Sequence, residues 1–383
     1  MKKIVLVAFL LSLSFVLVAC NSKPKLRILN WGEYINDEVV EKFEKEYGID
    51  IVISVADSNE LFYSKIKSKT TAFDIVIPSD YMIEKMVEEN MLLQLDYSLL
   101  PNRSLVTYMD GVNQIFASMT ETTFARSGLN INYNNYAVPY FWGTFGIIYN
   151  NRVEGLEEAL EEHGWAVYFE PNNYFSSARR GMYAVPQFAY ASAMMYLGNN
   201  PNEYNSALLA QTKTVLQNSN FVEWGNDTLK RNIEANNLDM AFTYTGDYLD
   251  RLYIQLSEGK TLEEVRATFD IYIPDTTMVF IDSMVIPNTA KNIEGAHQFI
   301  NFLLDPENAA LNAEVVGYAV AFEEAFDIIL SYLNSEDIEM KNWATANSIY
   351  YNMEIERTYY PLTSLQPSII DSISTMIDQV RTG

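Results

Sequence analysis

Residues 26–34 read Leu-Arg-Ile-Leu-Asn-Trp-Gly-Glu-Tyr, and this stretch decides how the rest of the chain is interpreted. A short apolar run centred on Ile28 and Leu29 ends abruptly at an aromatic ring, a glycine, a carboxylate and a phenol. Residues 37–47 then place apolar side chains on one helical face, and Gly48 supplies a stop. This order predicts an open α/β sheet, in which ligands bind beyond the carboxyl ends of the strands. Aromatic rings beside a carboxylate suit an organic ammonium, although the same rings would also serve as ordinary core at a strand end.

Two further strand-and-helix pairs follow this opening. Residues 50–55 and 73–77 are predicted strands, and helices are expected to begin near Ser58 and within the segment Pro78-Ser79-Asp80-Tyr81. Strands that alternate with helices of about 10–15 residues indicate a mainly parallel sheet. We therefore expect Ser79 and Tyr81 to lie at the same sheet edge as Trp31 and Glu33.

The middle of the chain leads into a second lobe. Residues 101–138 are polar and are expected to form an irregular surface excursion. Residues 138–150 read as a crossover strand in which Gly143 and Gly146 separate two β-like runs, and a loop is expected around Trp165. The other predicted elements are helices at 154–162, 187–197, 203–217, 247–257, 293–304 and 306–315, and strands at 240–244, 269–273 and 278–286.

Length and charge limit the classes of function. With 383 residues, of which 49% are hydrophobic, the chain is long enough for two lobes. The 26 Lys and Arg residues stand against 50 Asp and Glu residues, which gives a formal net charge of −24. Such an acidic surface argues against a nucleic-acid partner and favours the approach of a cationic ligand.

The N-terminus has the pattern of an export signal. Lys2 and Lys3 precede an apolar run that closes with Leu-Val-Ala-Cys at Cys20, which resembles a bacterial lipobox. We therefore expect residues 1–19 to be a signal peptide, Cys20 to carry lipid, and residues 20–25 to form a tether. The protein would then lie at the outer face of the cell membrane or in the periplasm. Cys20 is the only cysteine, so a disulfide within the chain and cysteine catalysis are both excluded.

Several motifs further along the chain point to one family. They lie at residues 30–34, 74–81, 138–150, 280–287, 292–306 and 317–318. On these motifs the chain resembles the bacterial solute-binding lipoproteins of the spermidine/putrescine ABC-transporter family. The resemblance implies an α/β, type II periplasmic-binding-protein fold, with two lobes joined by a hinge and the ligand in the cleft. It places residues 26–137 and 281–326 in lobe one, and residues 138–280 and 327–383 in lobe two.

The resemblance also implies which residues contact the ligand. They are Trp31, Glu33, Tyr34, Ser79, Tyr81, Tyr244, Phe280, Asp282 and Tyr318. Asp282 is implied to pair with a ligand amine, while the rings cover the methylene groups, each cation–π contact contributing roughly 0.5–2 kcal/mol. The implied function is capture of a polyamine, spermidine or putrescine, and its delivery to an ABC permease. A monomer without a cofactor or metal is expected.

One departure from the family pattern bears on the ligand. Where the family carries two acids that bind a terminal amine from lobe two, this chain has Ala184 or Val185 and Phe188. A buried ammonium without a partner is costly, so either another acid substitutes or the ligand lacks that amine. Asp80 and Asp247 are the candidate substitutes, although both lie near predicted helix starts, where a carboxylate commonly acts as a cap. Another organic cation therefore remains open as cargo.

Three other functions compete with polyamine binding. An enzyme is not expected, because the only histidines, His163 and His297, have no Ser-His-Asp arrangement or metal-ligand spacing around them. Ferric iron is an alternative cargo, since phenolates bind iron in relatives with this fold, and a surface lipoprotein without transport is another. The tyrosines that leave iron open are Tyr318, Tyr350, Tyr351, Tyr359 and Tyr360.

Overall fold

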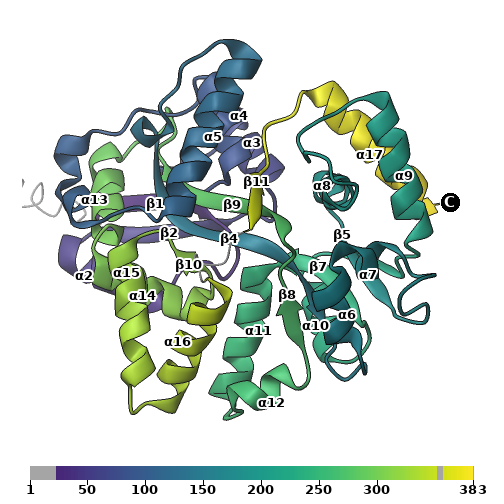
Figure 1. Cartoon of the computed structure of the whole chain (residues 1–383). Coiled ribbons are helices and arrows are strands. Elements are labelled where there is room, and N and C mark those ends of the chain that lie inside the picture. Colours follow the sequence, from purple (N-terminus) through teal and green to yellow (C-terminus); the bar gives the residue numbers. More distant parts are fainter. Residues whose placement is uncertain (1–22, 352–356, 383) are drawn as a thin grey trace, which may run out of the picture.

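The computed structural model describes residues 23–351 and 357–382, and it places them in two α/β lobes that share a continuous run of strands (Figure 1). The strand order is β2-β1-β3-β9-β4-β7-β5-β6, with β8 and β10 also paired to β4 and β11 paired to β9. The strands are β1 Lys25–Asn30, β2 Asp50–Val55, β3 Ile75–Val76, β4 Ala137–Tyr149, β5 Arg180–Tyr183, β6 Glu223–Gly225, β7 Met240–Tyr244, β8 Asp270–Tyr272, β9 Thr276–Val285, β10 Ala319–Val320 and β11 Thr358–Pro361.

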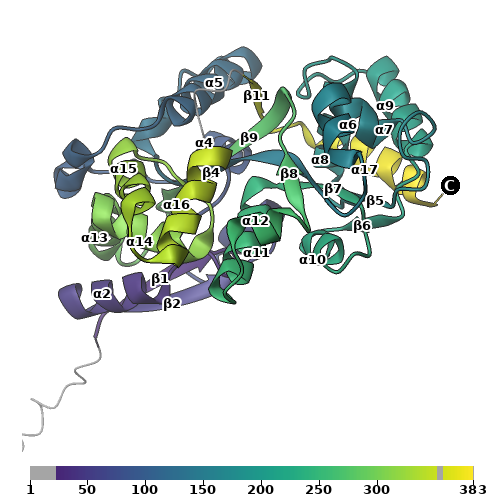
Figure 2. The ribbon, with the colours of Figure 1, turned by 60° about the horizontal axis from the view of Figure 1, so that its bottom comes forward.

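Helices surround these strands in both lobes, as the turned view in Figure 2 shows. The helices are α2 Asp37–Tyr47, α3 Asn59–Ser68, α4 Asp80–Glu88, α5 Asp110–Ser127, α6 Leu156–His163, α7 Trp165–Phe169, α8 Pro186–Tyr196, α9 Ser206–Asn218, α10 Thr228–Glu234, α11 Thr245–Ser257, α12 Leu262–Arg266, α13 Ile293–Leu303, α14 Pro306–Val316, α15 Glu323–Ser331, α16 Ile338–Tyr350 and α17 Pro367–Thr382.

Lobe one begins with the stretch that opened the sequence. Strand β1 lies between β2 and β3, parallel to both, so Ile28 pairs with Ile53 on one side and Ile75 on the other. Strand β1 is flanked by strands on both sides, and Leu26, Ile28 and Leu29 are buried, which explains why the run at 26–29 is mostly apolar. Helix α2 follows and ends at Gly48, the predicted stop. The carboxyl ends of β1 and β3 therefore meet at one edge, as expected.

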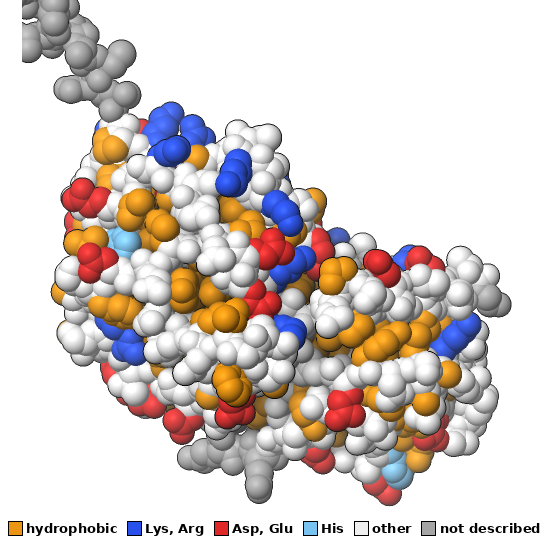
Figure 3. Space-filling view, turned by 90° about the horizontal axis from the view of Figure 1, so that it is seen from above, with side chains coloured by type: hydrophobic (Ala, Val, Ile, Leu, Met, Phe, Trp, Pro, Cys, Tyr) orange, Lys and Arg blue, Asp and Glu red, His pale blue; other side chains and the backbone are white. Residues whose placement is uncertain are grey.

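Two long strands connect the lobes. The first part of β4 pairs antiparallel with β9, and its last part, from Phe145 to Tyr149, pairs antiparallel with β7 of lobe two. The chain crosses once more after β11, which leads to α17 on the far side of lobe two. The space-filling view in Figure 3 shows the lobes as two rounded masses that meet at a narrower waist. The predicted two-lobed α/β fold is confirmed.

Three local predictions were wrong. Residues 110–127, expected to be irregular, form helix α5, and its buried residues at 112, 115, 116 and 119 have helical spacing within a polar sequence. Residues around Trp165 form helix α7 rather than a loop. The glycines of β4 do not interrupt the strand, which is continuous from Ala137 to Tyr149. At Gly143 a Cβ atom would lie 3.0 Å from the Phe280 ring, so the glycine serves close packing there.

The C-terminal part of the chain is divided between its neighbours. Helix α17 packs on α8 and α9 of lobe two, whereas α15 packs on α14 of lobe one. Helix α16 contacts both α15 and α11. The domain boundaries given above remain a prediction, because two of them fall in or beside the strands that run through both lobes.

The predicted signal peptide, the lipidation at Cys20 and most of the tether lie outside the described residues. Among the helices of residues 23–351 and 357–382, none combines the length and apolar character needed to cross a membrane.

Candidate ligand-binding site

Asp282 of β9 lies at the centre of the candidate site. Its carboxylate accepts hydrogen bonds from Ser79 Oγ at 2.6 Å and from Tyr34 Oη at 2.8 Å. Ser79 stands just before α4, Tyr34 lies beyond β1, and Asp282 lies within β9, so the three groups come from separate parts of the sheet. The structure thus brings together three residues that are 248 positions apart at the extremes. Asp282 is only 5% exposed, which makes these hydrogen bonds the main polar surroundings of a buried carboxylate.

The support beneath these groups includes a residue that the sequence did not single out. Asn59, at the start of α3, accepts from Ser79 N and donates to Ser79 Oγ, both at 3.0 Å. Trp31 is fixed by a hydrogen bond from its indole Nε1 to Ile77 O at 2.8 Å. Glu33, in contrast, is exposed in a turn with a φ of 52°, and it shares no hydrogen bond with the Asp282 group.

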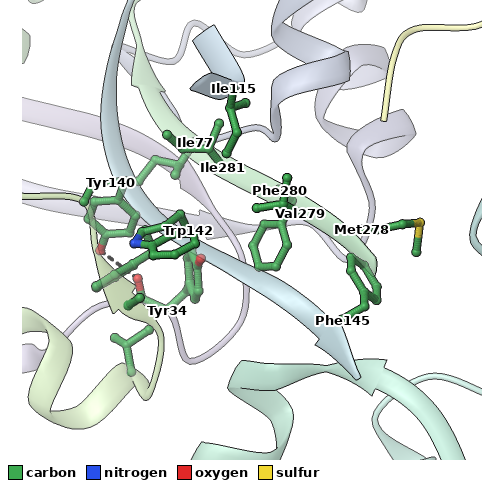
Figure 4. Close-up of a cluster of buried hydrophobic side chains, with 14 of the residues drawn as sticks. Tyr34, Ile77, Ile115, Tyr140, Trp142, Phe145, Met278, Val279, Phe280 and Ile281 are labelled. Carbon is green, nitrogen blue, oxygen red and sulfur yellow. Dashed lines mark hydrogen bonds between the residues drawn. The ribbon is translucent and has the colours of Figure 1, made fainter. Parts of the chain in front are cut away.

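Aromatic rings from both lobes fill the space beside Asp282. The Tyr34 ring packs edge-on against Tyr318 at 5.2 Å between centroids, and Phe280 lies 6.0 Å from Tyr318. On the lobe-two side Tyr244 packs against Phe280 at 5.0 Å. Figure 4 shows Tyr34 beside Tyr140 and Trp142, Phe280 in the middle of the cluster and Phe145 at its other end. Three of the predicted aromatic positions, Tyr244, Phe280 and Tyr318, therefore form one continuous wall.

A small pocket with a free volume of only about 10 Å³ lies between these rings and α4. Its lining residues are Ser79, Asp80, Tyr81, Phe145, Phe188, Tyr244, Val279, Phe280 and Leu362. Five of the predicted positions and substitutes thus share one pocket, while Phe145, Phe188, Val279 and Leu362 are apolar additions. Phe188 is the residue that stands at an expected acidic position, and its ring packs on Phe145 at 5.0 Å.

A larger hollow of about 510 Å³ lies on the outside of lobe two, between α9 and α17. It is lined by small, aliphatic and polar side chains that include Lys213 and Asp371, and no aromatic ring is among the residues described as lining it. The pocket beside Asp282 is therefore the better match to an organic cation.

The two candidate substitute acids differ in their partners. Asp80 is 1% exposed; its Oδ1 accepts from Tyr81 N at 2.8 Å, and its Oδ2 has no hydrogen bond to any described residue. Asp247 is also buried, but it pairs with the ammonium of Lys230 at 3.1 Å and accepts from the Thr243 hydroxyl. Of the two, only Asp80 stands in the pocket wall with an unused carboxylate oxygen.

Burial raises the pKa of Asp80, which lines the pocket, and of Asp282, which does not line it but is hydrogen-bonded to Ser79 of the pocket wall. The pKa of Asp282 rises to about 6, since loss of solvent outweighs the hydrogen bonds from Ser79 and Tyr34. The pKa of Asp80 is raised well above its usual range, first by burial and then by the charges of Glu84 and Asp282, although the Tyr81 amide opposes this. A cation placed between these carboxylates would relieve both penalties.

Several other predicted residues are occupied by packing. Trp142 donates from Nε1 to Val320 O, and Trp165 donates from Nε1 to Thr276 O, each at 2.9 Å. Tyr350 is hydrogen-bonded to Asp270 and to Tyr248. The phenol of Tyr351 donates to Gly317 O, so these two tyrosines are engaged within the fold rather than in the pocket.

Gly246 permits the closest contact between the lobes and gives a testable expectation. A Cβ atom at this position, in the first turn of α11, would overlap the ring of Tyr318. Gly246→Ala should therefore disfavour the closed arrangement and increase the radius of gyration measured by small-angle X-ray scattering. Gly32→Ala is the matched control, because its Cβ would lie at an ordinary 3.7 Å from Val55. An unchanged radius for both variants would show that the contact does not control closure.

Buried carboxylates and edge-packed rings at the junction of two lobes suit the binding of a small cationic solute. The chain belongs to the family described as bacterial extracellular solute-binding protein, whose model matches residues 38–345.

Individual relatives match over nearly their whole length. The chain is 29% identical over 365 residues to the putrescine-binding periplasmic protein of Pseudomonas aeruginosa, covering 94% of this chain and 92% of the relative. It is 29% identical over 363 residues to the spermidine/putrescine-binding periplasmic protein of Escherichia coli, covering 90% and 94%. Among solved structures, a putative spermidine/putrescine ABC transporter from Listeria monocytogenes matches with a TM-score of 0.72 and 31% identity, covering 94% of this chain and 99% of that one. The resemblance seen in the sequence is confirmed.

Proposed function

We propose that the protein is an extracellular receptor that captures a polyamine between its lobes and delivers it to an ABC permease. The observation that carries the proposal is the pair of buried carboxylates, Asp282 and Asp80, beside an aromatic wall formed by both lobes. A polyamine is a flexible alkyl chain with ammonium groups, so carboxylates take its charged end while rings cover its methylenes. Asp80 is the acid that replaces the missing pair of lobe two.

The names of the relatives support this ligand class. Those of Pseudomonas aeruginosa and Escherichia coli are named for binding putrescine, or spermidine and putrescine. The solved structure from Listeria monocytogenes is named as part of a spermidine/putrescine ABC transporter. They give no support to ferric iron as cargo or to a surface role without transport.

The cellular setting follows from the N-terminal pattern. Cys20 carries the lipid, which holds the receptor at the outer face of the cell membrane or in the periplasm. The receptor works as a monomer with the permease subunits as its partners. Closure is driven by the ligand, because an ammonium contacted from both lobes stabilises only the closed state.

Calorimetric titration tests the proposal. The mature chain that follows the predicted signal peptide, residues 20–383, is unfolded and refolded to remove bound ligand, and it is then titrated with putrescine and with spermidine. Saturable binding of either amine with one site per chain is expected. A correctly folded protein that binds neither amine would overturn the proposal, and a charge-transfer colour band on adding ferric iron would support the rejected alternative.

The raised pKa of Asp282 predicts a pH dependence of binding. An ammonium pairs with the ionised carboxylate, so protons compete with the amine below the pKa of about 6. Affinity should be nearly constant above pH 7 and fall up to roughly tenfold per pH unit below pH 6. Because the pKa of Asp282 in the folded protein lies above the usual aspartate value of 3.8, its ionisation lowers the stability of the unliganded fold as pH rises from about 4 to about 6. Titrations between pH 5 and pH 8 check the slope, and Asp282→Asn should remove its share of the slope.

A further inference from the structure

Lys230 places a largely buried ammonium group between α10 and α11 of lobe two. It projects from α10 and pairs with Asp247 at 3.1 Å and with Asp250 at 3.0 Å, both in α11. Its side chain is 13% exposed and that of Asp247 is 6% exposed, so the pair is largely removed from solvent. A lysine side chain and a polyamine both end in an ammonium group. Lys230 therefore supplies, from the protein itself, the group that a ligand amine would otherwise bring to Asp247.

Asp247 stands directly behind the aromatic wall of the site. Asp247 lies three residues after Tyr244, which lines the pocket. Gly246, the residue before Asp247, lies against the ring of Tyr318. After burial, its charge is the first cause that raises the pKa of Tyr318 and of Tyr183, whose ring lies 5.4 Å from that of Tyr244. Asp247 is therefore the carboxylate of lobe two that a second ligand ammonium would meet.

The two ends of the cleft consequently differ in charge balance. At the lobe-one end, Asp80 and Asp282 form no ion pair with any Lys or Arg of the described chain, and their hydrogen bonds come from hydroxyls and an amide. At the lobe-two end, Lys230 is already the cationic partner of both Asp247 and Asp250. An additional ligand ammonium there would have to share Asp247 with this fixed ammonium and would be repelled by it.

We propose that Lys230 is a specificity-determining residue that occupies Asp247 and restricts the cleft to diamines over triamines. The proposal rests on the polyamine function argued above and specifies its ligand: a dication such as putrescine matches the two free carboxylates of lobe one. A trication such as spermidine carries one ammonium more than these carboxylates balance.

Lys230 is not the sole ionic link between α10 and α11. Arg251 of α11 donates to Glu234 of α10 at 2.7 Å and provides an independent ion pair between the same two helices. Removing the Lys230 ammonium should therefore leave the helices docked and free Asp247 for the ligand.

The test compares selectivity in refolded chains of residues 20–383. Wild type, Lys230→Met and Lys230→Arg are each titrated calorimetrically with putrescine and spermidine, and folding is checked by circular dichroism. Lys67→Met is the matched control, because it removes one lysine charge from an exposed ion pair with Glu89 on the outside of lobe one. Lys230→Arg keeps the positive charge and serves as the variant least prone to misfolding.

Wild type, Lys230→Arg and Lys67→Met should bind putrescine more tightly than spermidine. Lys230→Met should shift the ratio of the two dissociation constants at least tenfold toward spermidine. Preference of the wild type for spermidine, or an unchanged ratio in a folded Lys230→Met protein, would overturn the inference while leaving polyamine binding in place. If no variant binds either amine, the proposed function fails and the inference fails with it. If Lys230→Met does not fold, a wild-type preference for spermidine still overturns the inference, and a preference for putrescine retained by Lys230→Arg supports it.

Discussion

Asp282→Asn should weaken amine binding by about 2 kcal/mol or more, which is roughly a 30-fold rise in the dissociation constant. The amide keeps the shape of the carboxylate and retains an oxygen that can accept from Ser79 or Tyr34. It lacks the negative charge that pairs with an ammonium in a site removed from solvent. The raised pKa of Asp282 means that its buried charge destabilises the protein when no ligand is bound. Without ligand, the variant should therefore be at least as stable as the wild type.

The control for this variant is another buried aspartate of the same lobe. Asp74 accepts hydrogen bonds from the backbone amides of Arg27, Lys291 and Asn292 and lies outside the pocket. Asp74→Asn should lower stability and leave the affinity for amines unchanged. Equal affinity of Asp282→Asn and wild type in calorimetric titration would mean that the ligand ammonium does not bind at β9.

Arg126→Ala should destabilise the folded protein by about 3 kcal/mol, because it leaves a buried carboxylate without its charged partner. Glu84 of α4 is fully buried and lies 3.4 Å from Arg126 Nη1. The same two side chains bind the segment that crosses to lobe two after β11: Ser364 N donates to Glu84 at 3.0 Å, and Arg126 donates to Ser364 O at 3.1 Å. The loss should appear as a lower midpoint in urea unfolding.

The pH dependence of this loss identifies its cause. Burial already raises the pKa of Glu84, and removal of Arg126 should raise it further. The folded variant then holds the Glu84 proton more tightly than the unfolded chain does, so its stability falls as pH rises through the acidic range. The difference from wild type should be larger at pH 8 than at pH 5, and Glu84→Gln combined with Arg126→Ala should recover part of it. A loss that is independent of pH would point to lost packing instead of an uncompensated charge.

The parts of the fold that follow local rules were predictable from the sequence. The alternation of strands and helices in residues 26–88, and the crossover strand at 138–150, depend on apolar periodicity that is visible in a short window. Helix α5 was not predicted because its apolar face is narrow and interrupted by polar residues. The polar composition of the segment suggested a loop, although the spacing of its few apolar residues is helical. The short strands β6, β10 and β11 have two to four residues each, and pairing partners distant in the sequence define them.

The candidate site was also only partly predictable from the sequence. Tyr34, Ser79 and Asp282 were named through motifs, and their common hydrogen-bond network depends on strand ends that only the fold brings together. The pairing of Lys230 with Asp247 has no local signature, because 17 residues and a strand separate the two. Asp80 and Asp247 looked equivalent in the sequence, and the difference between them comes from that distant lysine.

The most direct test of polyamine binding at this site is a crystal structure of the refolded chain with putrescine. One ammonium nitrogen is expected within about 3.2 Å of a carboxylate oxygen of Asp282 or Asp80, with the methylenes against the rings of Tyr244 and Phe280. An amine bound in the hollow between α9 and α17, or an ammonium far from both carboxylates, would contradict it.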